Sequence, residues 1–170
     1  TDSFKSSRGL RQGDPISPYL FVLALERLGH RIQDLVNNDN WSPLKFGSGS
    51  AAVSISHMMF ADDLIMIAEA TVDQAHLIRN VLDDFCNKSG QKVNLHKSKV
   101  FFSNNMRESN AQVICDILGV EQTSDLGTYL GAPMIHQRIT KTTFSFLIDK
   151  MRRNYLVEKR ILYPLQGVLP

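Results

Sequence analysis

The sequence of 170 residues has the length of one domain, and its 43% hydrophobic and 21% charged residues are typical of a protein with a hydrophobic core. No apolar run approaches the roughly 18 residues that span a bilayer and no signal peptide opens the chain, so we expect an intracellular protein, nuclear or cytoplasmic. The net charge of +2 is too small to indicate nucleic-acid binding by itself. Residues 136–170 are the basic part of the chain, with seven Lys or Arg residues against two acidic ones.

The first stretch of the chain, residues 1–17, predicts a polar loop that can approach an anion. Arg8 and Arg11 supply donors, and Gly9 and Gly13 let the backbone come close to a ligand. Loops of this composition are more often simple turns. The loop leads into an expected helix, however, and the positive end of a helix dipole favours an anion at that place.

That helix is expected to begin with Ser17 as its cap and Pro18 in its first turn, and to end at Asn37. Three- and four-residue spacing gives it an apolar face, formed by Phe21, Leu25, Leu28, Ile32 and Leu35. The segment from Trp41 to Phe46 then predicts at most a short edge strand.

Residues 56–68 are two apolar runs around a pair of adjacent carboxylates, Asp62 and Asp63, and predict a hairpin with the pair at its turn. Phe60 and Ala61 lead directly into the pair and Leu64 follows at once, so two negative charges lie at the edge of a dry region. Like charges so close repel unless a cation lies between them, and Mg²⁺ prefers carboxylate oxygens. Taken alone, such a pair is most often only a polar turn.

The rest of the chain alternates between helical and extended patterns. A capping box of Thr71 and Gln74 begins a helix that Gly90 ends. Residues 93–103 are expected to be extended, with a strand over residues 99–103. A helix over 107–118 follows, capped by Asn105 and Glu108 and ended by Gly119. Cys86 and Cys115 lie in these two helical patterns without metal-ligand spacing, which predicts buried free thiols.

Residues 126–134 predict a short hairpin, and a last helix from Thr140 presents Phe144, Leu147, Ile148 and Met151. The order of helix, hairpin, helix, strand, helix, short hairpin and helix predicts an α+β fold with helices on one face of a small antiparallel sheet.

Three stretches together resemble the reverse transcriptases of non-LTR (LINE-type) retrotransposons, most like those of plants. These stretches are the loop Arg8-Gly9-Leu10-Arg11-Gln12-Gly13-Asp14-Pro15-Ile16-Ser17-Pro18, the hairpin Phe60-Ala61-Asp62-Asp63 and the turn Tyr129-Leu130-Gly131. The resemblance implies a polymerase palm, partial here, over residues 1–135 and the beginning of a helical thumb over 136–170. It also implies RNA-directed DNA polymerase activity with two Mg²⁺ ions, an RNA or DNA template, a DNA primer and deoxynucleoside triphosphates.

The same resemblance assigns roles to individual residues. Asp62 and Asp63 would be metal ligands and catalytic, with Lys97 as the proton donor to pyrophosphate, although Lys99 is close enough to replace it. The incoming nucleotide and the template would be bound by Arg11, Gln12, Gly13, Phe60 and Ala61. The primer grip would be Tyr129, Leu130 and Gly131, and the nucleic-acid backbone would be held by Lys150, Arg152 and Arg153.

Two departures from the family pattern limit these expectations. The first metal-binding aspartate of the family lies on a strand upstream of the glutamine loop, where neither Asp2 nor Asp14 can replace it; Asp14 is expected to structure its own loop. We therefore expect a piece of a longer protein that polymerises nothing alone. Residues 155–164 also diverge from the tryptophan and Leu-Ser-x-Ala-Gly-Arg pattern of the family, as in a decayed or truncated reading frame.

Two other functions stay open at this point. One is an inactive remnant or domesticated module that binds nucleic acid or a protein. The other is a magnesium-dependent phosphatase or nuclease built on the Asp pair, although it lacks the additional acidic or His cluster that such hydrolases need.

Overall fold

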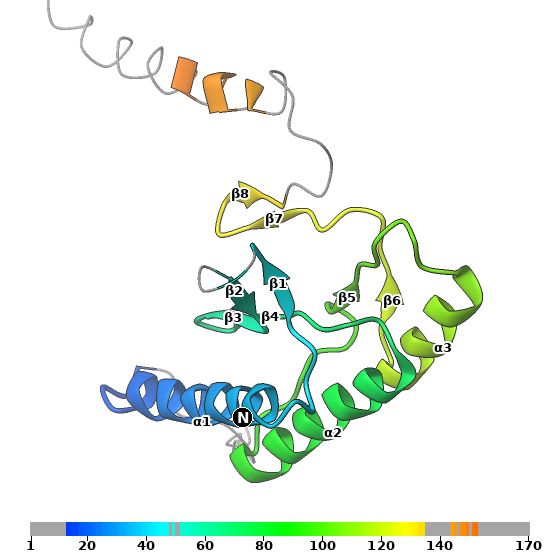
Figure 1. Cartoon of the computed structure of the whole chain (residues 1–170). Helices are drawn as coiled ribbons and strands as arrows, with labels where there is room; N and C mark the ends of the chain where they lie inside the picture. Colours follow the sequence, from blue (N-terminus) through cyan, green and yellow to red (C-terminus); the bar gives the residue numbers. More distant parts are fainter. Residues whose placement is uncertain are drawn as a thin grey trace, which may run out of the picture. The chain divides into compact units, whose positions relative to one another are not determined.

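A computed structural model describes residues 13–47, 49, 52–134, 144–145, 147–149 and 151–152 (Figure 1). The chain forms two compact units, Thr1–Ser124 and Asp125–Pro170. The first unit holds three helices and three strand pairs within its described residues. The second unit holds a short hairpin and helical residues between 145 and 152. The α+β class predicted from the sequence is therefore confirmed.

Helix α1 covers Ser17–Asn37 and ends where the sequence predicted. Its N-cap is Ile16, which makes no side-chain capping bond, so the prediction that Ser17 caps the helix is wrong. The turn before the helix is organised by Asp14 instead, because its carboxylate accepts from the Ile16 amide at 3.0 Å and its carbonyl from the Ser17 amide at 3.1 Å. This confirms the local role expected of Asp14.

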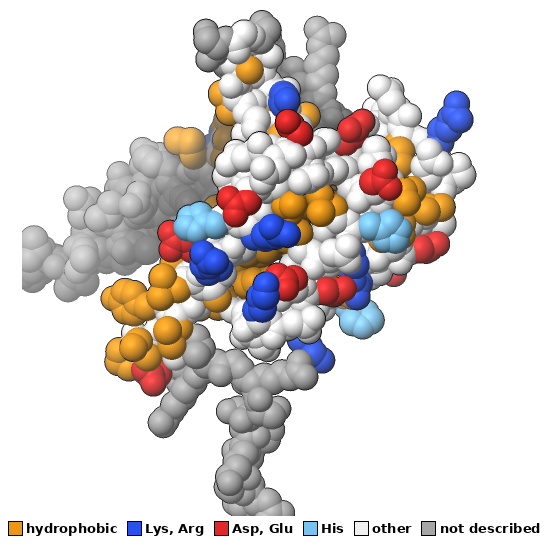
Figure 2. Space-filling model, turned by 60° about the horizontal axis from the view of Figure 1, so that its bottom comes forward, with side chains coloured by type: hydrophobic (Ala, Val, Ile, Leu, Met, Phe, Trp, Pro, Cys, Tyr) orange, Lys and Arg blue, Asp and Glu red, His pale blue; other side chains and the backbone are white. Residues whose placement is uncertain are grey.

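The two ends of α1 differ in burial. The C-terminal half buries Leu28, Ile32 and Leu35, whereas the N-cap Ile16 and four large apolar side chains of the first turns are exposed: Tyr19, Leu20, Val22 and Leu23. Hydrophobic side chains gather at the lower left of Figure 2, over these first turns. The N-terminal half of α1 is thus not part of the core of the described residues.

Helix α2 covers Val72–Ser89, with Thr71 as its cap and Gly90 at φ +71° after its last turn. The hydroxyl of Thr71 accepts from the Gln74 amide at 3.2 Å, which is the first half of the predicted capping box. The second half is wrong, because the Thr71 amide donates to the Glu69 carbonyl at 2.9 Å and the Gln74 side chain turns to another loop.

Helix α3 covers Glu108–Leu118 and ends at Gly119, as predicted. Its N-cap is Arg107 without a side-chain capping bond, so the capping role predicted for Asn105 is wrong. Both cysteines are free thiols as predicted; Cys115 is buried and Cys86 is half-buried. Burial raises the pKa of the Cys115 thiol, and the nearby carboxylates of Asp116 and Glu108 add to this effect.

The strands of the described residues form separate pairs, not the single antiparallel sheet that the sequence predicted. Strand β1 (Leu44–Phe46) pairs with β2 (Val53–Ile55) and β3 (His57–Phe60) with β4 (Asp63–Met66), both antiparallel. Strand β5 (Lys99–Val100) pairs with β6 (Glu121–Gln122) in parallel, because the chain crosses over through α3 between them.

Strand β5 lies within the strand predicted over residues 99–103 but is shorter, and the extended segment predicted over residues 93–103 is not continuous. A turn interrupts that segment, since the amides of Lys97 and Ser98 both donate to the Asn94 carbonyl at 3.1 Å. Asparagine favours such turns through its short polar side chain, and the Asn94 side chain also accepts from the Lys97 amide. The alternation of apolar residues in this segment therefore did not indicate a continuous strand.

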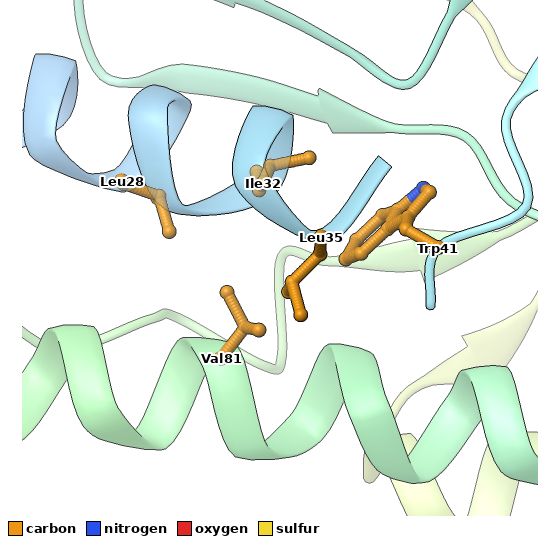
Figure 3. Packing of buried hydrophobic residues seen from close by; sticks show 5 residues of the cluster. All are labelled: Leu28, Ile32, Leu35, Trp41 and Val81. Carbon is orange, nitrogen blue, oxygen red and sulfur yellow. The ribbon is translucent and has the colours of Figure 1, made fainter. Parts of the chain in front are cut away.

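The core of the first unit lies between α1, α2 and the loop after α1. Leu28, Ile32 and Leu35 of α1 meet Trp41 and Val81 there, and Ile32 and Trp41 are less than 2% exposed (Figure 3). Three residues of the β3–β4 hairpin, Met59, Leu64 and Met66, pack against this cluster. The helices thus support one face of the hairpin, as the α+β prediction requires.

The second unit contains the predicted short hairpin, formed by β7 (Thr128–Tyr129) and β8 (Ala132–Pro133). Residues 145, 147–149 and 151–152 are helical, within the helix predicted from Thr140. The apolar residues predicted on that helix, Phe144, Leu147, Ile148 and Met151, are all exposed. In the described part of the chain, no helix has the length and apolar character needed to cross a membrane.

Candidate active site

The β3–β4 hairpin places the two adjacent carboxylates at its exposed end. Phe60 and Asp63 form the last pair of the ladder, so Ala61 and Asp62 alone make the turn. Ala61 has φ +49°, in the left-handed region where a residue with a Cβ atom is strained. Asp62 and Asp63 are both exposed. Strained backbone of this kind often occurs at functional sites, where the surrounding structure holds it.

The two faces of the hairpin carry different side chains. Met59 and Leu64 are opposite each other and pack against the core, and successive residues of a strand alternate between its faces. The next pair, Phe60 and Asp63, therefore belongs to the face away from the core. The Phe60 side chain is 58% exposed. An exposed aromatic ring thus lies beside a carboxylate on a surface that α1 and α2 do not cover.

His57 begins the hairpin beside α1 and was not singled out from the sequence. Its Nδ1 lies 2.9 Å from the hydroxyl of Ser56, which is buried, and burial lowers the pKa of the imidazole. A Cβ atom added to Gly29 of α1 would lie 3.3 Å from His57 Nε2. Gly29 in the middle of a helix is explained by this close approach. An open hollow beside the contact is lined by Leu25, Glu26, Gly29, His30, Gln33, His57, Met58 and Met59.

The two lysines that the sequence left as alternatives have different surroundings. Lys99 forms an ion pair with Glu121 across the β5–β6 ladder, and this bond and charge lower the pKa of the Glu121 carboxyl. Lys97 is exposed on the turn that follows Asn94, and makes no ion pair with any described residue. The geometry therefore leaves the Lys97 ammonium more available than that of Lys99.

The other predicted site residues are spread over both units. Gly13 is exposed with φ +88°, while Arg11 and Gln12 lie outside the described residues. In the second unit, Leu130 and Gly131 form the turn of the β7–β8 hairpin after Tyr129. Arg152 is exposed and helical, and Lys150 and Arg153 are not among the described residues.

The carboxylates of Asp62 and Asp63 suit a hard cation, but they make up only part of a coordination sphere. No group of three or more His, Cys, Asp or Glu side chains that could hold a metal comes together among the described residues. Mg²⁺ is commonly bound by one or two carboxylates, with waters and substrate phosphates completing its octahedron. The pair fits that mode of binding and would leave most positions to water, substrate or another carboxylate.

A carboxylate-bearing hairpin supported by helices is the arrangement that the sequence led us to expect of a template-directed polymerase. Residues 1–150 match the family described as "Reverse transcriptase (RNA-dependent DNA polymerase)". The chain belongs to this reverse transcriptase family, which confirms the family predicted from the sequence.

Among curated proteins, the chain is similar to polyproteins of R2 retrotransposable elements. It is 32% identical over 97 residues to the "Retrovirus-related Pol polyprotein from type-2 retrotransposable element R2DM" of Drosophila melanogaster, covering 57% of this chain and 8% of that protein. The corresponding type-1 element R2 protein of Popillia japonica is 32% identical over 73 residues, or 43% of this chain and 11% of that protein. These relatives agree with the non-LTR resemblance.

A plant protein also matches. The "Uncharacterized mitochondrial protein AtMg01250" of Arabidopsis thaliana is 42% identical over 57 residues, which are 34% of this chain and 45% of that protein. The chain thus matches less than half of the length of each of these three relatives.

Proposed function

We propose that the β3–β4 hairpin supplies two carboxylates to the metal site of an RNA-directed DNA polymerase. The observation that carries this proposal is the exposed pair Asp62 and Asp63 at a strained turn, in a chain of the reverse transcriptase family. The substrates would be deoxynucleoside triphosphates, a DNA primer and an RNA or DNA template. The reaction would be attack of the primer 3′ hydroxyl on the α-phosphate of the nucleotide.

Asp62 would be the main metal ligand and Asp63 a supporting one. Mg²⁺, when bound, lowers the pKa of the attacking hydroxyl and stabilises the charge on the leaving pyrophosphate. Because Asp62 in the turn and Asp63 at the start of β4 lie at the end of a ladder packed on the core, their positions need little reorganisation when substrate arrives. Phe60, whose exposed ring is beside Asp63, and Ala61 would together lie under the primer terminus and the new base pair.

Other residues would bind the substrates and transfer the proton. Lys97 is our choice as proton donor to pyrophosphate, since Lys99 is held by Glu121. Arg11, Gln12 and Gly13 would contact nucleotide and template, where arginine offers a bidentate match to phosphate.

The second unit would hold the duplex. Tyr129, Leu130 and Gly131 of its hairpin would be the primer grip. The palm of the polymerase would extend to residue 135, and the thumb would follow it. Lys150, Arg152 and Arg153 would contact backbone phosphates, and binding through them would weaken as salt rises.

Metal binding is the first test of this proposal. We expect Mn²⁺, a paramagnetic substitute for Mg²⁺, to broaden the NMR signals of Ala61, Asp62 and Asp63 in the whole chain. Asp62→Asn combined with Asp63→Asn should remove this broadening, because an amide is a much weaker ligand for hard cations than a carboxylate. Equal broadening in the double variant would contradict the proposal.

Primer extension on an RNA template with Mg²⁺ tests the reaction itself. We expect the chain alone to be inactive, because among the described residues Asp62 and Asp63 are joined by no third side chain that could complete a metal site. Synthesis by the chain that disappears in the double variant would mean that a further carboxylate, for example from a second copy, completes the site. Synthesis that persists in the double variant would show that the catalytic carboxylates lie elsewhere.

A further inference from the structure

The side chain of Gln74 joins α2 to the loop that follows α1, although its sequence position suggested a helix cap. Its Nε2 donates to the Asn40 carbonyl at 2.7 Å, and its Oε1 accepts from the Ser42 amide at 3.1 Å. Both polar ends of one amide are therefore used on residues more than thirty positions away. The amide of Thr71, the usual partner of such a glutamine, is already bonded to the Glu69 carbonyl.

The same loop holds the segment that follows the β3–β4 hairpin. Trp41 lies between the two residues that Gln74 binds, and its indole Nε1 donates to the Ile67 carbonyl at 2.9 Å. The Ser42 carbonyl accepts from the Glu69 amide at 3.0 Å. Residues 40–42 thus bond to α2 on one side and to residues 67–69 on the other, and the amides of Asn40 and Trp41 also donate to the Leu35 carbonyl of α1 at 2.9 and 3.1 Å.

These bonds act at the base of the hairpin, opposite the carboxylates. The Ile67 amide donates to the Ser56 carbonyl at 2.7 Å, which closes the hairpin where its strands begin and end. Asp63 lies four residues before Ile67, about 13 Å along a strand. Because the intervening strand is paired along its length, a rotation at Ile67 is carried to the carboxylate end.

Apolar packing alone would not fix that orientation. Met59, Leu64 and Met66 rest on the core cluster, and hydrophobic contact is non-directional, so it permits small rotations and shifts. Hydrogen bonds depend on both distance and angle. We propose that Gln74 is a positioning residue for Asp62 and Asp63, which acts by holding residues 40–42 against the base of the β3–β4 hairpin, the carboxylate hairpin. This inference rests on the proposed function of the Asp pair.

The test compares Gln74→Ala with Thr71→Ala in the whole chain. Both substitutions remove a polar group at the N-terminal end of α2, but only Gln74→Ala removes the bonds from α2 to Asn40 and Ser42. The bonds of the Asn40 and Trp41 amides to the Leu35 carbonyl stay in both variants. Hydrogen exchange at the Ile67 and Glu69 amides measures how stable the hydrogen bonds at the base of the hairpin are. Mn²⁺ affinity, from broadening of the Asp62 and Asp63 signals, measures the effect on the carboxylates.

We expect Gln74→Ala to speed exchange at both amides and to weaken Mn²⁺ binding, each by about threefold to tenfold relative to Thr71→Ala. Gln74→Glu keeps the acceptor for the Ser42 amide but sets a carboxylate oxygen against the Asn40 carbonyl, which it repels, so it too should speed exchange and weaken Mn²⁺ binding relative to Thr71→Ala. Gln74→Glu also replaces Gln74→Ala as the test variant if the alanine variant does not fold.

Equal exchange in the two alanine variants would overturn the inference. So would faster exchange in Gln74→Ala with unchanged Mn²⁺ affinity, since Gln74 would then be merely structural. If the variant carrying both Asp62→Asn and Asp63→Asn showed the same Mn²⁺ broadening as the wild type, the proposed function would be overturned instead.

Discussion

Among the described residues, the β3–β4 and β7–β8 hairpins have tight turns that are held in different ways. The β3–β4 and β7–β8 hairpins both turn through two residues, and in both the first of these is not glycine but has positive φ: +49° at Ala61 and +52° at Leu130. In the second hairpin Gly131 follows with φ +78°, a conformation that glycine adopts without a steric penalty. In the first, Asp62 follows.

The strands differ as well. The β3–β4 ladder joins four residues to four and rests on the core through Met59 and Leu64. The β7–β8 ladder joins two residues to two, and Leu130 is 54% exposed. The carboxylate hairpin is therefore stabilised from outside, by the core and by the loop of residues 40–42. The β7–β8 turn depends more on its own local conformation.

The largest effect that would sharpen this contrast is expected from Trp41→Ala. Trp41 is 1% exposed, so its loss should cost about 3–5 kcal/mol of the free energy of unfolding, from lost burial and the cavity left behind. Leu130→Ala, on the exposed turn, should change it by less than about 0.5 kcal/mol. Urea unfolding measures both. A cost of Trp41→Ala below about 1 kcal/mol would contradict the claim that the core supports the carboxylate hairpin.

Exchanging residue types at the two turns should give effects of opposite sign. Ala61→Gly removes the steric cost of positive φ and should stabilise by up to about 1 kcal/mol, whereas Gly131→Ala introduces that cost and should destabilise by about 1 kcal/mol. An alanine Cβ at position 131 would meet no atom within 4 Å, so the conformation alone decides its cost. The measurement is urea unfolding followed through NMR signals of each hairpin. Effects of the same sign would show that the turns do not differ as described.

The sequence predicted the features of this fold that are encoded locally. The cap of α2 at Thr71, the ends of α2 and α3 at Gly90 and Gly119, and the position of the Asp pair at a hairpin turn all follow from neighbouring residues. The features that it missed depend on distant segments. The parallel pairing of Lys99 with Glu121 needs α3 to cross between the strands, and the use of Gln74 depends on a loop more than thirty residues away.

A smaller effect is expected at the contact between α1 and the carboxylate hairpin. Alanine is favoured over glycine inside a helix by about 1 kcal/mol, but at position 29 its Cβ would press on His57 Nε2 at 3.3 Å. Gly29→Ala should therefore gain clearly less than that amount in the wild-type background. In a His57→Ala background, Gly29→Ala should gain nearly the whole of that free energy of unfolding. A double-mutant cycle by urea unfolding checks this, and equal gains in both backgrounds would show that His57 does not constrain α1.

The smallest effect concerns the pH dependence of the same contact. Burial lowers the pKa of His57 below its usual 6.5, so between that value and its folded pKa the unfolded chain binds a proton that the folded chain does not. The contribution of His57 should accordingly be lost as pH falls through this window, and be constant above it. Neighbouring groups include Ser56 at Nδ1 and, around the adjoining hollow, His30 and Glu26.

Urea midpoints at about pH 7.5 and about pH 5.5 should therefore differ more in the wild type than in His57→Gln. His30→Gln is the matched control, because it removes an imidazole beside the same hollow but without the contact to Gly29. An equal reduction of the pH difference in both variants would assign the effect to the general charge of the region. A reduction confined to His57→Gln would show that the contact between the carboxylate hairpin and α1 weakens in acid. The β7–β8 hairpin has no histidine in its strands or turn, so it should lack this pH dependence.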